Sequence, residues 1–468
     1  MRARRTKIIA TIGPATDSPT VLRRLLRAGC DAVRVNASHG DPADWDRRIR
    51  LIRDAEERRG RPVPIVFDLS GPKIRTGRLP DGGRMLARGE RIVLAPEGEA
   101  RAGEIPVSYA RLARSVEAGD RILVDDGLFE WRVRAVVGRR VLAQVRTPGL
   151  LKDHKGINLP GVRLKIDPLT DKDRRDAALA VARQVDWVAQ SFVRSAADVR
   201  RMKSLLGSIG GAIPVIAKIE KPEALEDIDN ILDVADALMV ARGDLGVEIE
   251  PQKVPEVQKH LIARANAAEK PVIVATQMLE SMIEHPRPTR AEASDVANAI
   301  FDGADAVMLS AETASGRYPV VSVAMMAAIA SEAERSPYAG APLSSGAERP
   351  GVAHAVARAA GEIAREVSAS GIVCFTESGK TAVLLSKVVR ELPILAFSRT
   401  VATCRRISLS RGVRAAVLPM PDDTDAMIAQ AKAALRASRF LRRGSRVVIV
   451  SGPARVPGAT NMIRVEEL

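Results

Sequence analysis

The sequence predicts an α/β protein made of a (β/α)8 TIM barrel, a small β-barrel lid domain inserted into it, and a C-terminal α/β domain. Three observations support this prediction. Short β-branched runs alternate with amphipathic segments eight times. The alternation is interrupted once, after the third run, by a region of different texture. A stretch rich in Pro, Gly and Ser then separates the barrel from a further α/β segment.

The eight predicted strands are nearly continuous in Val, Ile and Ala, as is typical of parallel strands buried on both faces. They are Lys7–Gly13, Ala32–Ala37, Pro64–Leu69, Trp187–Phe192, Pro214–Glu220, Ala237–Ala241, Pro271–Thr276 and Ala306–Ser310. Apolar residues at helical spacing predict the crossover helices between them. The clearest are Ser18–Ala28, Asp41–Arg58, Ala196–Leu206, Glu256–Ala268, Arg290–Phe301 and Val320–Glu334.

The interruption consists of short alternating strands separated by Gly, Pro and Asp turns. These strands are Arg91–Ala95, Arg121–Val124, Leu128–Ala135 and Arg140–Gln144. Loops between strands and helices tolerate such insertions because the scaffold carries the fold. We therefore predict that residues 1–70 and 169–336 form the barrel and that residues 71–168 form a β-rich lid.

The chain beyond the barrel reads as a separate domain. Residues 337–350 are predicted to be a linker because they show no periodicity. Residues 351–468 then form an α/β domain with one clear helix and three buried strands. These are Val352–Val367 for the helix and Gly371–Thr376, Pro393–Phe397 and Arg446–Val450 for the strands.

Composition excludes several classes of protein. Charged residues make up 28% of the chain and hydrophobic residues 46%, which is the ordinary globular range. No apolar run is long enough to span a membrane, and we expect no signal peptide, because the basic residues 1–6 lead straight into the first strand without an apolar stretch and a cleavage site. The three cysteines, Cys30, Cys374 and Cys404, lie far apart without a Cys-x-x-Cys motif. They favour a cytoplasmic protein without a disulfide or zinc framework.

The net charge of +15 has two interpretations. Of 72 basic residues, 15 are Lys and 57 are Arg, and they are spread along the chain. Aromatic residues are only 3%, which disfavours nucleic-acid binding by base stacking. The charge either steers an anionic substrate such as a phosphate towards the protein or reflects a general composition bias.

Polar residues cluster at the predicted C-terminal ends of the strands, where barrels of this kind carry their active sites. Three cations and three carboxylates are therefore expected to face one mouth. The cations are Arg34, Arg75 and Lys218, and the carboxylates are Asp68, Glu220 and Asp244. Other polar residues at these ends are Asn36, Ser38, His39, Lys73, Thr276, Ser310 and Glu312.

Glu220 and Asp244 follow adjacent strands, and two such carboxylates repel each other unless a cation lies between them. Magnesium, or manganese in its place, takes one or two protein carboxylates and completes its shell with substrate oxygens and water. The sequence therefore predicts a Mg²⁺ (or Mn²⁺) site. The alternative is a pair of salt bridges, from Lys218 to Glu220 and from Arg242 to Asp244.

The other strand-end residues suit phosphate chemistry. The compact ammonium of Lys218 can neutralise a phosphoryl group during transfer, and the planar fork of Arg34 matches phosphate oxygens. Thr276 could relay a proton. The alternatives are structural ion pairs for Lys218 and Arg34 and a helix cap for Thr276. His39 either contacts a nucleotide or is an exposed surface residue.

A loop in the C-terminal domain carries part of a phosphate-binding motif. Residues 376–381 (TESGKT) end in Gly-Lys-Thr after a predicted strand, but Cys374 stands where a Walker A motif requires its first glycine. An ATPase is therefore disfavoured. Small residues before a helix can still hold a phosphate on backbone N–H groups. Together with residues 451–453 and 457–458, we interpret the loop as an effector pocket, with plain turns as the alternative.

The strand-end motifs together resemble those of the pyruvate kinase family over essentially the whole chain. The matching motifs are residues 7–15 (KIIATIGPA), 34–40 (RVNASHG), 216–220 (IAKIE), 239–246 (MVARGDLG), 275–281 (ATQMLES) and 308–313 (MLSAET). The resemblance implies phosphoryl transfer from phosphoenolpyruvate to ADP, giving pyruvate and ATP in the last step of glycolysis. It also implies that the C-terminal domain is regulatory.

The resemblance further implies a role for each matching residue. Glu220 and Asp244 would bind magnesium, and the backbone N–H groups around Gly243 and Asp244 would hold the substrate carboxylate. Arg34 and Lys218 would bind the phosphoryl group, and Thr276 would lie on the path that protonates C3. The residues expected on the ADP side are Asn36, His39, Arg75 and, from the lid, Lys155.

One departure concerns potassium. Many family members need this ion and carry the motif DTKGPE at the third strand end, whereas residues 68–73 here read DLSGPK. Leu69 and Lys73 resemble the potassium-independent branch. The ammonium of Lys73 is expected to stand beside Asn36, Ser38 and Asp68 in place of the ion, so K⁺ is not expected to be required.

The resemblance also suggests partners. The family is usually a homotetramer, and an effector such as a sugar phosphate or AMP is expected at the loop of residues 376–381. Its binding residues would be Thr376, Ser378, Gly379, Lys380 and Thr381. We expect no nucleic-acid or membrane partner. Two alternative functions are a related TIM-barrel aldolase or lyase acting on a pyruvate enolate, and a non-catalytic basic binding protein.

Overall fold

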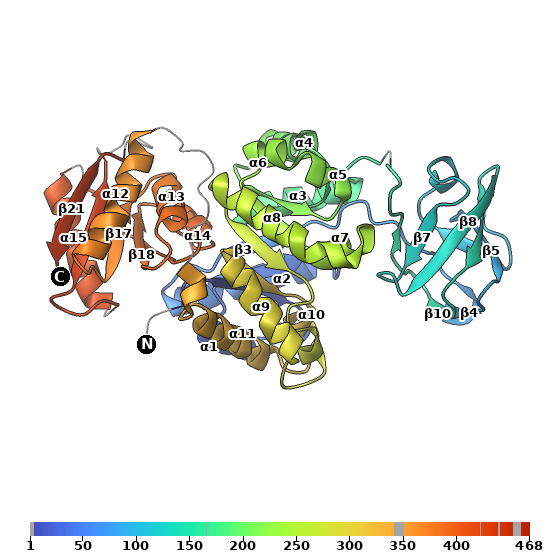
Figure 1. Cartoon of the computed structure of the whole chain (residues 1–468), viewed down its shortest axis with the longest axis horizontal. Coiled ribbons are helices and arrows are strands. Elements are labelled where there is room, and N and C mark those ends of the chain that lie inside the picture. Colours follow the sequence, from blue (N-terminus) through green and yellow to red (C-terminus); the bar gives the residue numbers. More distant parts are fainter. Residues whose placement is uncertain (1–3, 165, 341–350, 422, 439, 453–459) are drawn as a thin grey trace.

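Eight parallel strands form a closed barrel at the centre of the molecule (Figure 1). Their order around the ring is β1-β16-β15-β14-β13-β12-β3-β2, which confirms the predicted fold class. The computed structural model describes residues 4–164, 166–340, 351–421, 423–438, 440–452 and 460–468. The strands are β1 (Lys7–Ile12), β2 (Ala32–Asn36), β3 (Ile65–Asp68), β12 (Trp187–Val193), β13 (Val215–Ile219), β14 (Ala237–Ala241), β15 (Val272–Ala275) and β16 (Ala306–Leu309).

Helices with well-formed N-termini cover the outside of the barrel. The Ser18 side chain caps the first of them, and Thr170 and Thr289 form reciprocal capping boxes with Asp173 and Glu292. The larger helices are α1 (Pro19–Ala28), α2 (Pro42–Arg59), α3 (Asp171–Ala182), α4 (Ala196–Ser208), α6 (Ile228–Val234), α8 (Val254–Ala267), α9 (Arg290–Asp302) and α11 (Pro319–Ala333). Short helices α5 (Pro222–Glu226), α7 (Arg242–Glu248) and α10 (Ala311–Ala314) follow strands β13, β14 and β16.

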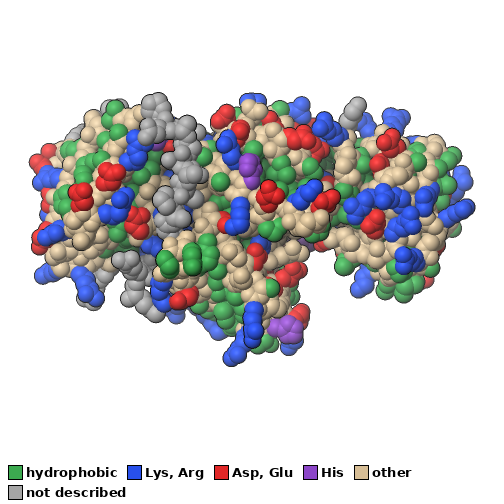
Figure 2. Space-filling model, in the orientation of Figure 1, with side chains coloured by type: hydrophobic (Ala, Val, Ile, Leu, Met, Phe, Trp, Pro, Cys, Tyr) green, Lys and Arg blue, Asp and Glu red, His purple; other side chains and the backbone are tan. Residues whose placement is uncertain are grey.

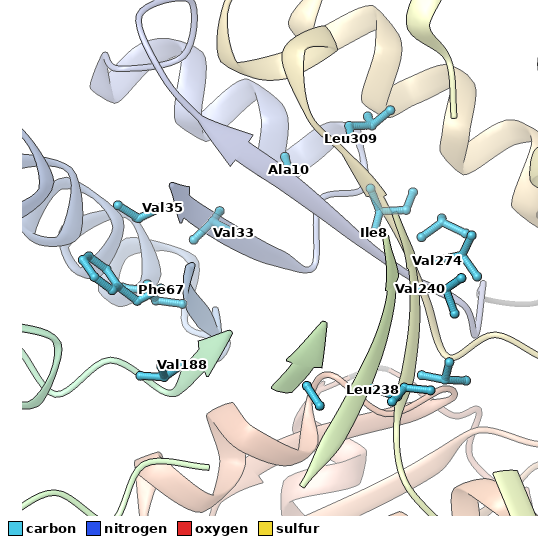
Figure 3. Packing of buried hydrophobic residues seen from close by; sticks show 14 of the residues in the cluster. Ile8, Ala10, Val33, Val35, Phe67, Val188, Leu238, Val240, Val274 and Leu309 are labelled. Atoms are coloured by element: carbon cyan, nitrogen blue, oxygen red, sulfur yellow. The ribbon is translucent and has the colours of Figure 1, made fainter. Parts of the chain in front are cut away.

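Apolar side chains pack on both sides of the barrel wall. Alternate residues of a strand face opposite sides, so Ile8 joins the cluster between strands and helices while Ile9 joins the cluster inside the barrel. Figure 3 shows the outer cluster, with Val35 and Phe67 on neighbouring strands. The inner cluster also contains Leu409, a fully buried residue of the C-terminal domain.

The lid is a separate lobe with its own apolar core (Figure 1). Its strands form a six-stranded sheet, in the order β11-β7-β8-β9-β5-β6, and a two-stranded ribbon of β4 and β10. The predicted strands correspond to β5 (Arg91–Pro96), β7 (Arg121–Val124), β8 (Phe129–Val137) and β9 (Arg140–Val145). The prediction missed β4 (Gly83–Leu86), β6 (Ile105–Val107), β10 (Gly149–Lys152) and β11 (Ile157–Asn158). β6 and β11 are too short to show alternation, and in β4 and β10 the two large apolar residues are adjacent.

The C-terminal domain contains a five-stranded sheet in the order β19-β18-β17-β20-β21. The predicted strands are β17 (Gly371–Phe375), β18 (Ile394–Ser398) and β20 (Arg446–Ser451), and the prediction missed β19 (Val413–Val417) and the antiparallel β21 (Met462–Glu467). Both missed strands lie at the sheet edges, and most of their residues are exposed or only half-buried. The helices are α12 (Val352–Glu366), α13 (Lys380–Val388), α14 (Val401–Ile407) and α15 (Thr424–Ser438). Most of the predicted linker, residues 341–350, lies outside the described part of the chain.

The C-terminal domain lies against the N-terminal ends of the barrel strands, opposite the lid. Lys387 of α13 forms a buried ion pair with Asp305, just before β16, and Nζ of Lys387 donates to Asn266 at 2.8 Å. Lys7 of β1 donates to the carbonyl oxygen of Val413 at 2.5 Å. Charged side chains therefore bridge the two domains at the base of the barrel.

Basic side chains are spread over the face of the molecule that Figure 2 shows. On the face seen in Figure 2, Lys and Arg side chains lie on all three lobes and are interspersed with Asp and Glu. Among the described helices, none has both the length and the apolar character needed to cross a membrane.

Candidate active site

Four charged side chains meet inside the mouth of the barrel. Nε of Arg34 donates to Oδ2 of Asp68 at 2.7 Å, and Nζ of Lys218 lies 3.3 Å from Oδ1 of Asp68. Nζ of Lys218 also lies 2.8 Å from Oε1 of Glu220. These residues belong to the ends of β2, β3 and β13, which meet because the strands are parallel. The exposed fractions of the Asp68 and Glu220 side chains are only 1% and 3%.

Burial and ion pairing set the protonation states of this cluster. Burial by itself would raise the pKa of Asp68, but Lys218 and Arg34 outweigh it and hold this pKa below its ordinary value. Burial would lower the pKa of Lys218, but Asp68 and Glu220 raise it above its ordinary value. The pKa of Glu220 is raised, first by burial and then by Asp244, against the opposing effect of Lys218. The site thus pairs an ammonium whose charged form is favoured with a carboxylate whose charged form an added cation would stabilise.

Two residues that the sequence analysis did not single out position this cluster. Oγ of Ser191 accepts a hydrogen bond from Nζ of Lys218 at 2.7 Å and donates to the carbonyl oxygen of Leu69 at 2.8 Å. The backbone N–H of Phe192 donates to Oε2 of Glu220 at 3.0 Å. Both residues stand at the end of β12, so the rule applied to the other strand ends would have found them.

The second predicted metal ligand, Asp244, lies in the first turn of α7. Its side chain is 36% exposed, and Oδ1 lies 3.8 Å from Nζ of Lys73. The predicted alternative of an Arg242–Asp244 salt bridge is wrong, because Arg242 pairs with Asp295 at 2.6 Å. The alternative Lys218–Glu220 ion pair is present.

Glu220 and Asp244 suit a hard divalent cation. They are close enough for Asp244 to raise the pKa of Glu220, and Asp244 is open to solvent. Within the described ranges, no group of three or more His, Cys, Asp or Glu residues converges on one point. A metal bound here would therefore need oxygens from a ligand or water, which is the usual coordination of Mg²⁺.

Thr276 lies in a strained turn that faces α7. It has φ of 68° and the next residue, Gln277, has φ of 54°, a region that non-glycine residues rarely occupy. Nη2 of Arg242 donates to the carbonyl oxygens of both residues, at 2.8 and 3.2 Å. Oγ1 of Thr276 accepts a hydrogen bond from the backbone N–H of Gly243 at 2.7 Å. The hydroxyl thus contacts α7, and the alternative role of a cap on the helix that follows it is not what the structure shows.

The residues expected on the ADP side come from both the barrel and the lid. Oδ1 of Asn36 accepts the backbone N–H of Ser38 at 3.1 Å. The pKa of His39 is lowered, first by burial and then by the positive charges of Arg75, Arg34 and Lys73. This concentration of cations favours an anionic ligand. The residues that belong to the lid are Arg75, whose Nη1 donates to the carbonyl oxygen of His154 at 3.0 Å, and Lys155, whose Nζ lies 2.9 Å from Oδ1 of Asp125.

Lys73 was predicted to replace a monovalent cation beside Asn36, Ser38 and Asp68. Leu69 is buried with 2% of its surface exposed. The ion pair described for Lys73 is with Asp244, whereas the ion-pair partners of Asp68 are Arg34 and Lys218. The ammonium of Lys73 therefore contacts a predicted metal ligand in this structure.

The loop of residues 376–381 opens onto a cavity of about 770 Å³. Oγ1 of Thr376 accepts the N–H of Gly379 at 2.9 Å, and the hydroxyls of Thr381 and Thr460 lie 2.9 Å apart. Gly379 has φ of 90°, and a Cβ atom at this position would clash with Ile407. The cavity is lined by Ser378, Gly379, Lys380 and Thr381 and also by barrel residues such as Lys203 and Asp236. Residues 453–459, part of the predicted pocket, lie outside the described residues.

Comparisons with known protein families and with individual proteins find the same similarity over nearly the whole chain. Residues 3–323 match the family described as "Pyruvate kinase, barrel domain", and residues 354–466 match "Pyruvate kinase, alpha/beta domain". A protein of Mycobacterium tuberculosis named pyruvate kinase is 44% identical over 99% of this chain and 98% of its own length. Pyruvate kinase 2 of Synechocystis is 45% identical over 99% of this chain and 79% of its own. A pyruvate kinase of Agrobacterium vitis is 44% identical, with 99% and 98% covered.

Proposed function

The chain belongs to the pyruvate kinase family, and from this premise we propose which of its residues carry the reaction. It is a phosphotransferase that moves the phosphoryl group of phosphoenolpyruvate to ADP and forms pyruvate and ATP. The observation that carries the assignment of residues is the buried contact of Lys218 with Asp68 and Glu220 next to Arg34.

Lys218 and Arg34 stabilise the phosphoryl group during transfer. In such reactions charge spreads over the three equatorial oxygens, and catalysis consists mainly of positioning and electrostatic stabilisation. Ser191 and Asp68 hold the ammonium of Lys218 in place before substrate binds. No reorganisation of these charges is then needed at the moment of reaction.

Pyruvate kinases generally use Mg²⁺ or Mn²⁺. Glu220 and Asp244 would hold the ion, which when bound polarises the oxygens of the substrate and offsets its negative charge. The backbone N–H groups of Gly243 and Asp244 would receive the substrate carboxylate.

Thr276 lies on the proton path to C3 of the enolate. Its hydroxyl accepts the N–H of Gly243, the same group proposed to bind the substrate carboxylate. Substrate binding would therefore free the Thr276 oxygen to accept a proton from a water, while the hydroxyl proton, which is donated to the carbonyl oxygen of Ala275 at 2.6 Å, moves towards C3.

Asn36, His39, Arg75 and Lys155 would bind ADP, and the lid would exclude water, which competes with ADP for the phosphoryl group. Arg75 and Lys155 belong to the lid, so that nucleotide binding and lid position are coupled. Binding of an anion is supported by the cations that lower the pKa of His39.

Potassium is not required in this proposal, because Lys73 supplies a fixed positive charge at the mouth. Wild-type activity should be nearly equal with and without K⁺ at constant ionic strength. Lys73→Glu should make activity depend on K⁺. A large activation of the wild type by K⁺ would contradict the assignment.

The remaining assignments concern regulation and assembly. A sugar phosphate or nucleoside monophosphate would bind the loop of residues 376–381, where Lys380 and the hydroxyls of Ser378 and Thr381 line the cavity. The enzyme would act as a homotetramer in the cytoplasm.

The decisive experiment is an assay of pyruvate and ATP formation from phosphoenolpyruvate and ADP, with Mg²⁺, K⁺ and candidate effectors varied separately. ATP formation that depends on Mg²⁺ supports the proposed metal ligands. Thr276→Val should slow the appearance of pyruvate while phosphoenolpyruvate binding and a single turnover of ATP formation are retained, which supports the proposed role of Thr276. Turnover in Glu220→Gln equal to the wild type would contradict the metal assignment.

A further inference from the structure

The lid and the barrel are joined by a hydrogen bond outside the two connecting segments. Nδ2 of Asn158 donates to Oε1 of Glu248 at 2.7 Å. Asn158 ends β11, which pairs with β7 in the lid sheet, and Glu248 ends α7 of the barrel. Glu248 is nearly buried, with 3% of its side chain exposed. This contact brings the lid sheet directly onto the helix that carries Gly243 and Asp244.

The carboxylate of Glu248 is already balanced from the barrel side. Nζ of Lys221 lies 2.5 Å from the same oxygen, Oε1, and only 9% of the Lys221 side chain is exposed. The ammonium also lies 5.2 Å from the centroid of the Phe192 ring. Because Lys221 compensates the charge, the neutral amide of Asn158 can leave without stranding a buried ion. A reversible lid contact needs this property.

The contact reaches both predicted metal ligands through short, rigid steps. Glu248 and Asp244 belong to the same seven-residue helix, so a displacement of one end of α7 displaces the other. Lys221 directly follows Glu220 in the chain. Phe192, whose ring contacts Lys221, donates its backbone N–H to Glu220. Phe192 has φ of 58° and lies at an irregularity of β12, so its position is tightly specified.

We propose that Asn158, Glu248 and Lys221 form a latch that ties the lid to α7 and aligns α7 with Glu220 while the phosphoryl group is transferred. The three are positioning residues, since they act through α7, the lid and Glu220. The proposal rests on the proposed function as a pyruvate kinase. Closure matters because water in an open site can take the phosphoryl group, giving pyruvate and inorganic phosphate in place of pyruvate and ATP.

The neutral amide of Asn158 and the charged carboxylate of Glu248 predict how variants of these two residues will behave. Asn158→Asp places a second carboxylate against Glu248, with Lys221 as the only ammonium described at the contact, so the lid should be held away from α7. Asn158→Ala only removes the contact and should have a smaller effect. Combining Asn158→Asp with Glu248→Gln moves the negative charge to the lid, where Lys221 can pair with it across the boundary. The double variant should therefore restore the contact between the lid and α7.

The test uses the full-length enzyme and measures kcat and KM for ADP, the ratio of pyruvate to ATP formed, and hydrogen exchange of the amides in β11 and α7. For Asn158→Asp we expect kcat/KM for ADP to fall by about 10- to 100-fold, as for displaced closing lids. The pyruvate-to-ATP ratio should rise above one, and exchange should be faster in α7. The double variant should recover to within about threefold of the wild type.

Arg163→Ala is the matched control, because Arg163 and Glu226 form an exposed pair at the same boundary, with 78% and 70% of their side chains exposed. The latch is refuted if Asn158→Asp keeps the wild-type product ratio and exchange rates, if the double variant fails to recover, or if Arg163→Ala shows the same loss. Wild-type enzyme that makes no ATP would instead refute the proposed function, and the exchange measurements would still test the latch.

Discussion

The barrel has a neighbouring domain at each end, and the two boundaries are built differently. At the mouth, the lid contacts the barrel through single polar contacts such as Asn158–Glu248 and the 3.8 Å pair of Lys73 and Asp244. At the base, charged groups of the C-terminal domain are buried against the barrel, and Leu409 enters its interior. Isolated polar contacts can break and reform at little cost, whereas buried ions and apolar contacts cannot.

The two boundaries are therefore suited to different tasks, one to movement of the lid and the other to passing the effect of a bound ligand to the barrel. The lid boundary is suited to opening and closing once in each catalytic cycle. The base is suited to holding the C-terminal domain and the barrel as one body, so that a ligand in the cavity at residues 378–381 acts on the barrel directly. Variants at the mouth of the barrel should accordingly change catalytic rates, and variants at the opposite end should change the free energy of unfolding.

The largest effect is expected at the mouth. Lys218→Met removes the ammonium that balances Asp68 and Glu220, and kcat should fall by about 10³-fold or more, as when other phosphoryl-stabilising cations are lost. Steady-state kinetics measures the loss, and circular dichroism should show retained secondary structure. A kcat within tenfold of the wild type would mean that the chemistry does not depend on this group.

The corresponding variant at the base should alter stability instead. Lys387→Met leaves the carboxylate of Asp305 buried without its ammonium, and both side chains are less than 5% exposed. Unfolding free energy should fall by about 3–5 kcal/mol in urea titrations, while kcat per folded molecule stays within about twofold of the wild type. If Asp305→Asn in the same chain restores none of the stability, the cost does not arise from the unpaired carboxylate.

The stability of the boundary between the barrel and the C-terminal domain is also expected to depend on pH. Burial lowers the pKa of Lys7 from 10.5 to about 8, although Asp31 opposes this. Between these two values the unfolded chain binds more protons than the folded one, so stability rises with pH across this window. Lys7→Met should remove a rise on the order of 3 kcal/mol between pH 8 and 10.5. The measurement is the difference in unfolding free energy between wild type and variant at several pH values, and a constant difference would contradict the shift.

The smallest effect is expected for Arg405, whose guanidinium contacts both carboxylate oxygens of Glu56 across the base, with a shortest distance of 2.7 Å. Arg405→Lys keeps the charge but loses the paired geometry. Stability should fall by about 1 kcal/mol, without a change in the pyruvate-to-ATP ratio. A changed ratio would show that the base also controls the lid, and the contrast between the two boundaries would fail.

Local patterns were sufficient to predict the barrel. Each of its strands is a buried apolar run, and parallel pairing then brings Arg34, Asp68, Lys218 and Glu220 together without further information. The lid strands β4 and β10 were missed because each has only two large apolar residues, which are adjacent and so show neither an alternation nor a longer apolar run.

The parts of the site that could not be predicted depend on tertiary contacts. The Arg242–Asp295 pair joins residues far apart in the chain, and the near neighbour Asp244 was the wrong guess. The positive φ of Thr276 and Gln277 is maintained by hydrogen bonds from Arg242, which no local propensity reveals. Ser191 was visible in principle, because it stands at a strand end like the residues that were chosen.

Leu409 has a consequence for how the chain can be divided. A side chain of the C-terminal domain completes the packing inside the barrel, so cutting the polypeptide between the two domains would leave a hole in the barrel floor and an exposed leucine on the other fragment. Neither piece is therefore expected to be complete on its own. A recombination event that exchanges the C-terminal domain must supply an apolar side chain that fills the place of Leu409.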